Sequence, residues 1–284
     1  MRPGATTRGS LRSRGGQRLV ACSLLVLAVA TAAAAQYRRG ERGLGRRATF
    51  AKLEDYDGTF QFCRAVFRAD RNGDGGDWSV DSPQADLNLS VRISELTKTA
   101  VGLGPDGEPN HLYVPLTDPV LYRCPFIMMT EVGSAYFDPT EAAHLRDYLL
   151  KGGFIWADDF WGEYAWDFWE RTIRKVLPSG SYPIKDLDLD HPLFHMMMTV
   201  KRVPQIPSIN VWLGSGRTSE RRDSQVAHAR AISDDHGRIM VLMTHNTDFG
   251  DSFEREGDSR NYFLTFSVEG YAFGVNALLY AMTH

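Results

Sequence analysis

The stretch from Asp138 to Asp159 reads DPTEAAHLRDYLLKGGFIWADD and carries the clearest fold signal in the chain. Asp138 is a helix-capping residue, Pro139 suits the first turn of a helix, and Glu141 stands where the second partner of a capping box is expected. Two glycines then end the helix, and the apolar run Phe154 to Ala157 follows at once. This run has the composition of a strand that is buried on both faces.

A second buried strand, Pro125 to Thr130, precedes this helix. Strand, helix and strand at this spacing predict a parallel βαβ unit with a right-handed connection. Further strands are expected at Thr59–Arg68, Leu112–Pro115, Ile209–Leu213, Gln225–Ile232 and Arg238–Thr244. Further helices are expected to start at Ser82-Pro83, with Ser82 as the cap, and to cover Glu163–Leu177 and Tyr271–Met282. We therefore predict one α/β domain over residues 49–284.

The amino terminus has the pattern of a targeting segment. Residues 1–18 contain five Arg and no acidic residue, and Leu19 to Ala35 contain no charge. This pattern predicts a signal peptide cleaved after Ala35, or alternatively an uncleaved anchor in the inner membrane. Residues 36–48 form a Gly/Arg-rich linker. Both alternatives place the domain outside the cytoplasm, either in the periplasm or secreted. The chain would contact the membrane only through the amino-terminal segment, if that segment is not cleaved.

Composition limits the function classes. A content of 43% hydrophobic and 24% charged residues is typical of a globular protein. Without residues 1–35 the chain has 27 basic and 35 acidic residues, a net charge of −8, which argues against nucleic acid as a partner. Cys63 and Cys124 stand in apolar, strand-like runs, where we expect two core thiols. A disulfide between them is the alternative in an oxidising compartment.

Several short blocks also resemble a known bacterial family. They are Gly76-Asp77-Trp78, Pro83–Thr97, Leu116–Pro119, Pro125–Gly133, Leu145–Asp159, Asp190–His195 and Gly274-Val275-Asn276. In this order they resemble the family called domain of unknown function 4159, over roughly residues 49–284. The family is grouped with the class I glutamine amidotransferase-like fold, so the resemblance implies a flavodoxin-like parallel sheet with helices on both faces. It implies no activity.

The sequence shows whether the chain has the nucleophilic Cys of amidotransferase-like enzymes. Those enzymes carry a Cys on a sharp turn just after a buried strand. The equivalent turn here follows Phe154–Ala157, reads DDFWG, and contains no Cys, Ser or Thr. Cys63 lies inside a predicted strand and Cys124 precedes one. Thiol catalysis is therefore not expected.

Polar residues follow several predicted strands, at the edge where open parallel sheets bind ligands. They are Glu131, Asp158, Asp159, His245, Asn246 and Asp248. Asp158, Asp159 and His245 are the candidate catalytic residues, with a divalent cation as the only cofactor considered. Glu131, Asn246, Asp248 and Trp161 are candidate ligand-binding residues. The alternative that we favour makes Asp158 and Asp159 caps of the next helix.

The segment from Asp70 to Asp81 has a calcium-loop pattern. Asp70, Asn72 and Asp74 stand at positions one, three and five of an EF-hand loop, and Asp81 stands at position twelve. The flanks disagree, because a strand enters this loop and Pro83 follows it. A Gly/Asp-rich connection is the better interpretation, with a calcium site as the alternative.

Two histidines have zinc-like spacing. His191 and His195 are four residues apart, but Pro192 between them favours an Asp-His-Pro turn over a metal-binding helix.

Four tryptophans crowd into one short segment, at positions 156, 161, 166 and 169. They suit either a wedge against the sheet or a surface for a protein or a saccharide. Two functional hypotheses follow. The first is an exported, non-catalytic binding or scaffold domain of the cell envelope, with a protein or glycan as partner. The second is an extracytoplasmic hydrolase that uses carboxylates.

Overall fold

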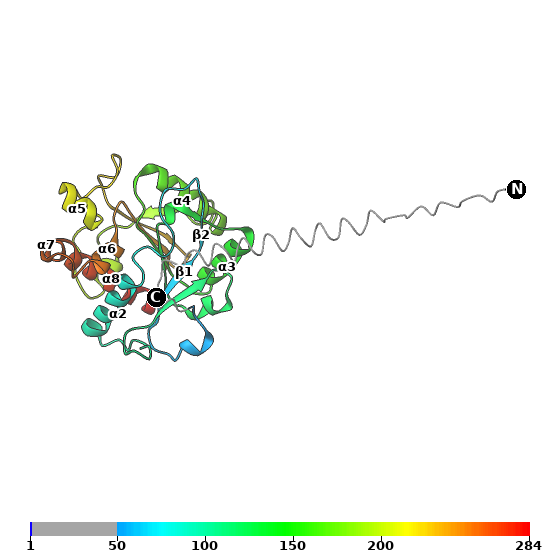
Figure 1. Cartoon of the computed structure of the whole chain (residues 1–284), viewed down its shortest axis with the longest axis horizontal. Helices are drawn as coiled ribbons and strands as arrows, with labels where there is room; N and C mark the ends of the chain where they lie inside the picture. The colour runs from blue at the N-terminus through cyan, green and yellow to red at the C-terminus, as the bar shows by residue number, and fades with distance from the viewer. Residues whose placement is uncertain (2–49) are drawn as a thin grey trace. The chain divides into compact units, whose positions relative to one another are not determined.

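The computed structural model describes Met1 and residues 50–284. The predicted signal segment (1–35, apart from Met1) and the predicted linker (36–48) lie outside the described residues. At the centre of residues 50–284 is a seven-stranded, mostly parallel sheet with helices on both faces (Figure 1). The fold is α/β and flavodoxin-like, as predicted, and it is compatible with the amidotransferase-like grouping that the resemblance implied.

The strand order of the sheet is β3-β1-β4-β6-β9-β8-β7. The strands are β1 (Phe62–Val66), β3 (His111–Pro115), β4 (Ile127–Thr130), β6 (Ile155–Asp158), β7 (Ile184–Asp186), β8 (His228–Ser233) and β9 (Ile239–His245). The first five strands of this order pair in parallel, whereas β8 pairs antiparallel with both of its neighbours, β9 and β7. In chain order the five parallel strands follow the 2-1-3-4-5 arrangement of flavodoxin-like sheets, whose strand order reverses between β1 and β4.

The helices form two layers, one on each face of the sheet. Helices α2, α6 and α8 pack together on one face, and α3 and α4 lie on the other (Figure 1). The α-helices are α2 (Gln84–Thr97), α3 (Pro139–Leu150), α4 (Gly162–Val176), α5 (Ile209–Ser215), α6 (Phe249–Glu254), α7 (Arg260–Tyr262) and α8 (Val268–Thr283). A π-helical turn, Phe263–Ser267, leads into α8, and a small separate sheet pairs β2 (Arg68–Ala69) with β5 (Ala135–Tyr136). Short 3-10 turns occur at Leu53–Asp55, Pro119–Arg123, Val132–Ser134 and Pro192–His195.

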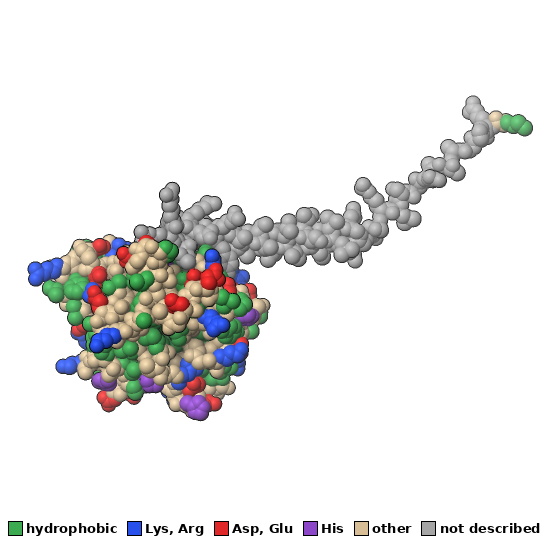
Figure 2. Space-filling model, turned by 90° about the horizontal axis from the view of Figure 1, so that it is seen from below, with side chains coloured by type: hydrophobic (Ala, Val, Ile, Leu, Met, Phe, Trp, Pro, Cys, Tyr) green, Lys and Arg blue, Asp and Glu red, His purple; other side chains and the backbone are tan. Residues whose placement is uncertain are grey.

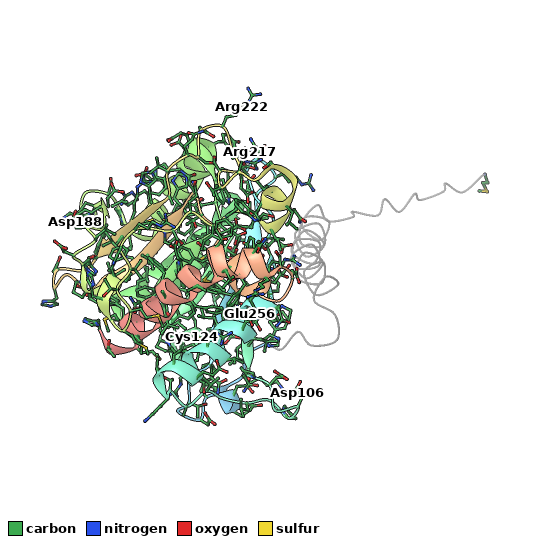
Figure 3. All side chains as sticks on the ribbon, turned by 90° about the vertical axis from the view of Figure 1, so that its left-hand side faces the viewer. Asp106, Cys124, Asp188, Arg217, Arg222 and Glu256 are labelled. Carbon is green, nitrogen blue, oxygen red and sulfur yellow. A yellow bond between two sulfur atoms is a disulfide. The ribbon has the colours of Figure 1, made fainter. Side chains whose placement is uncertain are left out.

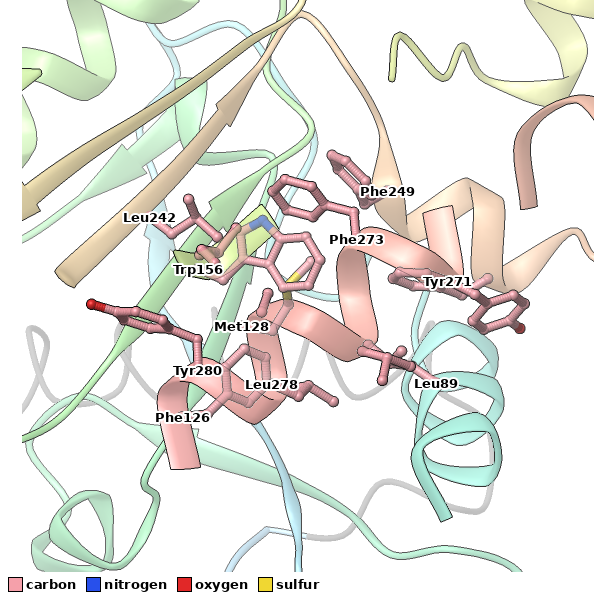
Figure 4. Close-up of a cluster of buried hydrophobic side chains, with 14 of the residues drawn as sticks. Leu89, Phe126, Met128, Trp156, Leu242, Phe249, Tyr271, Phe273, Leu278 and Tyr280 are labelled. Atoms are coloured by element: carbon pink, nitrogen blue, oxygen red, sulfur yellow. The ribbon is translucent and has the colours of Figure 1, made fainter. Parts of the chain in front are cut away.

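Trp156 of β6 is the centre of the core beneath α6 and α8 (Figure 4). Its ring lies 5.4 Å from that of Phe249 and 5.7 Å from that of Phe273, and its Nε1 donates to Thr244 Oγ1 at 2.8 Å. Complete burial of one large aromatic side chain stabilises a fold by roughly 3 kcal/mol. This packing fixes the carboxyl end of β6 relative to α6 and therefore positions the site described below.

The capping box at the start of α3 is confirmed. The Asp138 carboxylate accepts from the N–H groups of Thr140 and Glu141, and the Glu141 carboxylate accepts from the N–H of Asp138. The predicted cap of α2 is wrong. Ser82 precedes Pro83 through a cis peptide bond, and its hydroxyl bonds to Asp86 and Tyr113 instead of capping the helix.

The strand predicted at Ile209–Leu213 is also wrong, because this segment is helix α5. Ile209 and Trp212, three residues apart, turn inward, whereas Leu213 is 66% exposed. Gly216 ends the helix in a left-handed conformation, and its N–H donates to the carbonyl oxygen of Trp212. The apolar residues therefore follow a helical period, which over five residues resembles strand alternation.

Cys63 and Cys124 form a disulfide, so the expectation of two free core thiols is wrong. Cys63 lies on β1 and Cys124 just before β4, and these neighbouring strands bring the two α-carbons within 6.1 Å. That separation is within the range that a disulfide requires. No helix in the described residues is both long and apolar enough to cross a membrane.

Candidate functional site

The carboxyl edge of the parallel strands is the candidate site. Four non-glycine residues there have left-handed backbones, namely Asp81 (φ 63°), Glu131 (55°), Asp159 (55°) and Asn246 (62°). Asp81 lies in the connection between β2 and α2, and the other three come directly after β4, β6 and β9. This conformation is uncommon for residues with a side chain and persists only where the surroundings impose it. The four loops are therefore held in place at one edge.

Asp158 is the last residue of β6 and holds the start of α6. Its Oδ2 accepts from the backbone N–H groups of Phe249 at 2.8 Å and Gly250 at 3.2 Å, and its Oδ1 accepts from Thr244 Oγ1. Burial raises the pKa of Asp158 to about 7, although these donors act in the opposite direction. Because both of its carboxylate oxygens already accept hydrogen bonds from within the fold, Asp158 has a structural role.

Asp159 is the residue at the sharp turn between β6 and α4. Its side chain is 6% exposed, and its Oδ1 accepts from Nε1 of Trp161 at 3.0 Å. Burial, followed by the charges of Glu131 and Asp81, raises its pKa well above the ordinary value. The favoured expectation that Asp158 and Asp159 cap the next helix is wrong, because the first N–H groups of α4 donate to the side chains of Asn246 and Asp223 instead.

Asp159 converges with two carboxylates from other parts of the chain. One oxygen each from Asp81, Asp159 and Asp248 lie within 4.8 Å of one another, and all three residues are buried. Asp248 also caps α6, because its Oδ1 accepts from the N–H of Asp251 at 2.7 Å. A second group joins Asp81 to Asp251 and Glu254. We name Asp81, Asp159 and Asp248 the carboxylate triad.

Glu131 borders the triad after β4. Burial raises its pKa to about 7, and the charges of Glu220 and Asp74 add to this effect. It lies directly against Gly75, where a β-carbon would come within 2.5 Å of Glu131 Oε2. Glu131 therefore adds a further buried carboxyl group to the same edge.

His245 turns away from the carboxylate triad. Its Nε2 donates to the carbonyl oxygen of Gly162 at 3.0 Å, and its Nδ1 faces Nη1 of Arg230 at 3.3 Å. Burial is the main cause that lowers its pKa to about 4, so the ring is neutral near pH 7. Phe160 and Trp166 contact its ring at tilted angles, and His228 stacks on it with the ring centroids 6.0 Å apart.

Asn246 ties the turn after β9 to α4. Its Oδ1 accepts from the N–H of Gly162, and its Nδ2 donates to the carbonyl oxygen of Val226, both at 2.8 Å. Both ends of its side chain are therefore occupied within the fold.

The predicted calcium loop does not assemble as an EF-hand set. Asp70 accepts from the backbone and side chain of Asn72, and Asp74 pairs with Arg221 at 2.9 Å. Asp81, the twelfth position, is instead buried with Asp159 and Asp248. The loop therefore delivers one of its carboxylates to the triad.

The histidine pair forms the predicted turn. His191 Nδ1 accepts from the N–H of Leu193 at 3.2 Å, whereas His195 Nε2 lies 2.8 Å from the carbonyl oxygen of Leu189. Neither histidine belongs to a cluster of metal-ligating side chains among the described residues.

The tryptophan segment is mainly core. Trp156, Trp161 and Trp169 are buried, and Trp166 is half-buried under the guanidinium of Arg230, 4.1 Å from its ring. Tyr164 is the exposed ring of this segment, and its hydroxyl donates to the carbonyl oxygen of Asn72.

An arginine-rich groove that we did not predict borders the same edge. Its volume is about 550 Å³, and it is lined by Gln205, Gly216, Arg217, Thr218, Ser219, Arg221, Arg222 and Gln225. Gln205 connects the groove to the site, because its Nε2 lies 3.3 Å from the carbonyl oxygen of Asn246. Arg217 and Arg222 project outward from this loop (Figure 3). We name these eight residues the arginine groove.

The chain belongs to the family described as domain of unknown function DUF4159, whose profile matches residues 65–282. The matched range includes every residue of the carboxylate triad and of the arginine groove. No curated protein matches the chain.

Proposed function

We propose that the chain is an exported, non-catalytic binding domain of the cell envelope that recognises a protein or a glycan. The Cys63–Cys124 disulfide carries this proposal. It uses both cysteines of the described residues, which leaves no thiol nucleophile among them. Disulfides also persist in compartments outside the cytoplasm.

The geometry of the turn after β6 supports a role without covalent catalysis. Asp159 lies on the sharp turn after β6, which the family resemblance makes equivalent to the turn that carries the Cys of amidotransferase-like enzymes, and its backbone is left-handed. A nucleophile must be exposed to its substrate. The Asp159 carboxylate is instead buried and bonded to Trp161.

The hydrolase hypothesis receives less support, because it requires Asp158, Asp159 and His245 to act together. Asp158 is occupied by three donors from Thr244 and α6. His245 donates to the carbonyl oxygen of Gly162 and faces Arg230. An imidazole held in this way is not oriented to take a proton from a substrate near the carboxylates.

The arginine groove is the proposed recognition surface. Arg217 and Arg222 are exposed, and guanidinium groups bind carboxylate and phosphate oxygens in a two-pronged geometry. We therefore expect an acidic protein segment or an anionic glycan as the ligand. Nucleic acid is not proposed, because the net charge is negative without residues 1–35 and charges of both signs mix on the face in Figure 2.

The binding proposal is tested with the purified full chain and an envelope extract. Captured material is identified, purified and titrated by calorimetry against the wild type and the double variant Arg217→Ala/Arg222→Ala. The matched control is Lys185→Ala/Lys201→Ala, which removes two exposed cations elsewhere on the surface. We expect the arginine variant to lose binding and the lysine variant to keep it. Hydrolysis of an ester, amide or phosphate panel that disappears in Asp159→Asn would refute the non-catalytic role.

Export is tested separately by fractionating cells that produce the full chain or a chain lacking residues 1–35. We expect only the full chain to leave the cytoplasm and to carry the Cys63–Cys124 disulfide on a non-reducing gel. Equal distribution of the two chains would contradict export. Retention of the full chain in the membrane fraction would favour the uncleaved anchor.

A further inference from the structure

Three elements far apart in the sequence each contribute one buried carboxylate to the triad. Asp81 comes from the connection before α2, Asp159 from the turn after β6, and Asp248 from the turn after β9. Their exposed fractions are 9%, 6% and 4%, and one oxygen of each lies within 4.8 Å of the other two. Separations of this size suit oxygens that surround a single metal ion.

The triad has no cationic partner among the described residues. The neighbouring carboxylates Asp251 and Glu254 pair with Arg255, and no ion pair reaches Asp81, Asp159 or Asp248. The charge of the buried Arg64 acts on Asp81, but the Nε of Arg64 donates to both oxygens of Asp86. Ionising all three carboxyl groups in this buried position without a cation would be strongly unfavourable.

An oxygen of the triad also lacks any hydrogen-bond partner. Asp81 Oδ2 is buried and accepts from no described group. Thr130 Oγ1 is equally buried and unpartnered, and Thr130 pairs in register with Asp158, so both side chains lie on the same face of the sheet. Buried side-chain oxygens nearly always have a partner. The unpartnered Asp81 oxygen is therefore evidence for a ligand at this position.

We infer that Asp81, Asp159 and Asp248 bind one hard divalent cation, of the Ca²⁺ or Mg²⁺ class, with water completing its coordination. The ligand set contains only carboxylate oxygens, without the imidazole or thiolate that zinc prefers. The site differs from the calcium loop of the sequence, because it uses only Asp81 from that segment. The inference does not depend on the proposed binding of a protein or glycan.

The full chain is first freed of metal with EDTA. It is then titrated with Ca²⁺ in one calorimetric run and with Mg²⁺ in another. The thermal unfolding midpoint is followed at the same cation concentrations. We expect one cation per chain and a midpoint that rises with its concentration. Asp81→Asn should weaken binding by about tenfold or more. The same substitution should raise the midpoint of the metal-free protein, because it removes one of three crowded acidic groups that repel one another when they ionise. A merely structural role for Asp81 would not produce this pair of opposite effects.

Asp70→Asn is the matched control, because it lies in the same connection and still accepts from Asn72. It should bind the cation like the wild type. If Asp81→Asn does not fold, Asp159→Asn replaces it, since its amide oxygen still accepts from Trp161. Absence of binding at millimolar Ca²⁺ and Mg²⁺ would overturn the inference. Binding lost in Asp70→Asn and kept in Asp81→Asn would overturn it as well. The titration uses no partner molecule, so its failure would leave the proposed function unaffected.

Discussion

Gly250 lies directly against the carboxylate of Asp81. A β-carbon at position 250 would stand 2.1 Å from Asp81 Oδ2 and 2.9 Å from its Cγ. The N–H of Gly250 meanwhile donates to Asp158. The first turn of α6 therefore contacts one carboxylate through its α-carbon and another through its backbone. Only glycine allows both approaches at this position.

Gly250→Ala should consequently disturb the triad. The new methyl group forces Asp81 or α6 to move, and we expect a loss of about 1–3 kcal/mol in the free energy of unfolding. Urea unfolding measures this loss, and calorimetry should show weaker cation binding in the same variant. Gly257→Ala is the control, because no atom lies within 4 Å of the added carbon. Equal stability of the two variants would contradict the close contact.

The disulfide should contribute measurably to stability. It closes a loop over a sequence separation of 61 residues, and its removal in Cys63→Ala/Cys124→Ala is expected to cost about 2–4 kcal/mol. Tyr56 contacts both sulfur atoms through its hydroxyl, so Tyr56→Phe separates that contact from the covalent bond. Reductant should lower the urea midpoint of the wild type and leave the double variant unchanged. A wild type insensitive to reductant under unfolding conditions would argue against the bond.

The sequence was sufficient for elements whose signals are local. The start of α3 was predictable because Asp138 and Glu141 satisfy each other's backbone N–H groups within four residues. The buried strands β4 and β6 were predictable because an uninterrupted apolar run needs no long-range information. These elements suffice for the βαβ unit and hence for the fold class.

The sequence placed Asp159 and Asp248 at one edge of the sheet, but it could not bring Asp81 to them, because that contact joins residues far apart in the chain. Asp81 fitted a local calcium pattern, and only the reversal of strand order between β1 and β4 brings its loop to Asp159 and Asp248. A usable signal existed, since acidic residues follow β4, β6 and β9. The arginine groove gave no comparable signal, because its loop follows a helix that we predicted as a strand.

His245 should make stability sensitive to acid. The pKa of His245 is about 4 in the folded protein, against an ordinary value of 6.5 that applies to the unfolded chain. As the pH falls, the unfolded chain therefore takes up a proton first. The stabilisation is present above pH 6.5 and is lost towards pH 4, by about 2 kcal/mol between pH 7 and 4.5. His245→Gln, which still donates to the carbonyl oxygen of Gly162, should show a smaller loss of stability over this range in urea unfolding. His236→Gln, at an exposed position, should follow the wild type. If the free energy of unfolding fell with pH to the same extent in both variants, His245 would not be protected from protonation in the folded protein.

Two glycines at the end of α5 should respond in opposite directions to alanine. Gly214 lies within the helix and faces open space, so Gly214→Ala should stabilise the protein by about 0.5–1 kcal/mol. Gly216 also faces open space but has a φ of 68°, so Gly216→Ala should destabilise it by about 1 kcal/mol. Because neither methyl group meets another atom, the difference depends on backbone conformation alone. Urea unfolding of the two variants measures it, and a change of the same sign at both positions would contradict a helix that ends at Gly216.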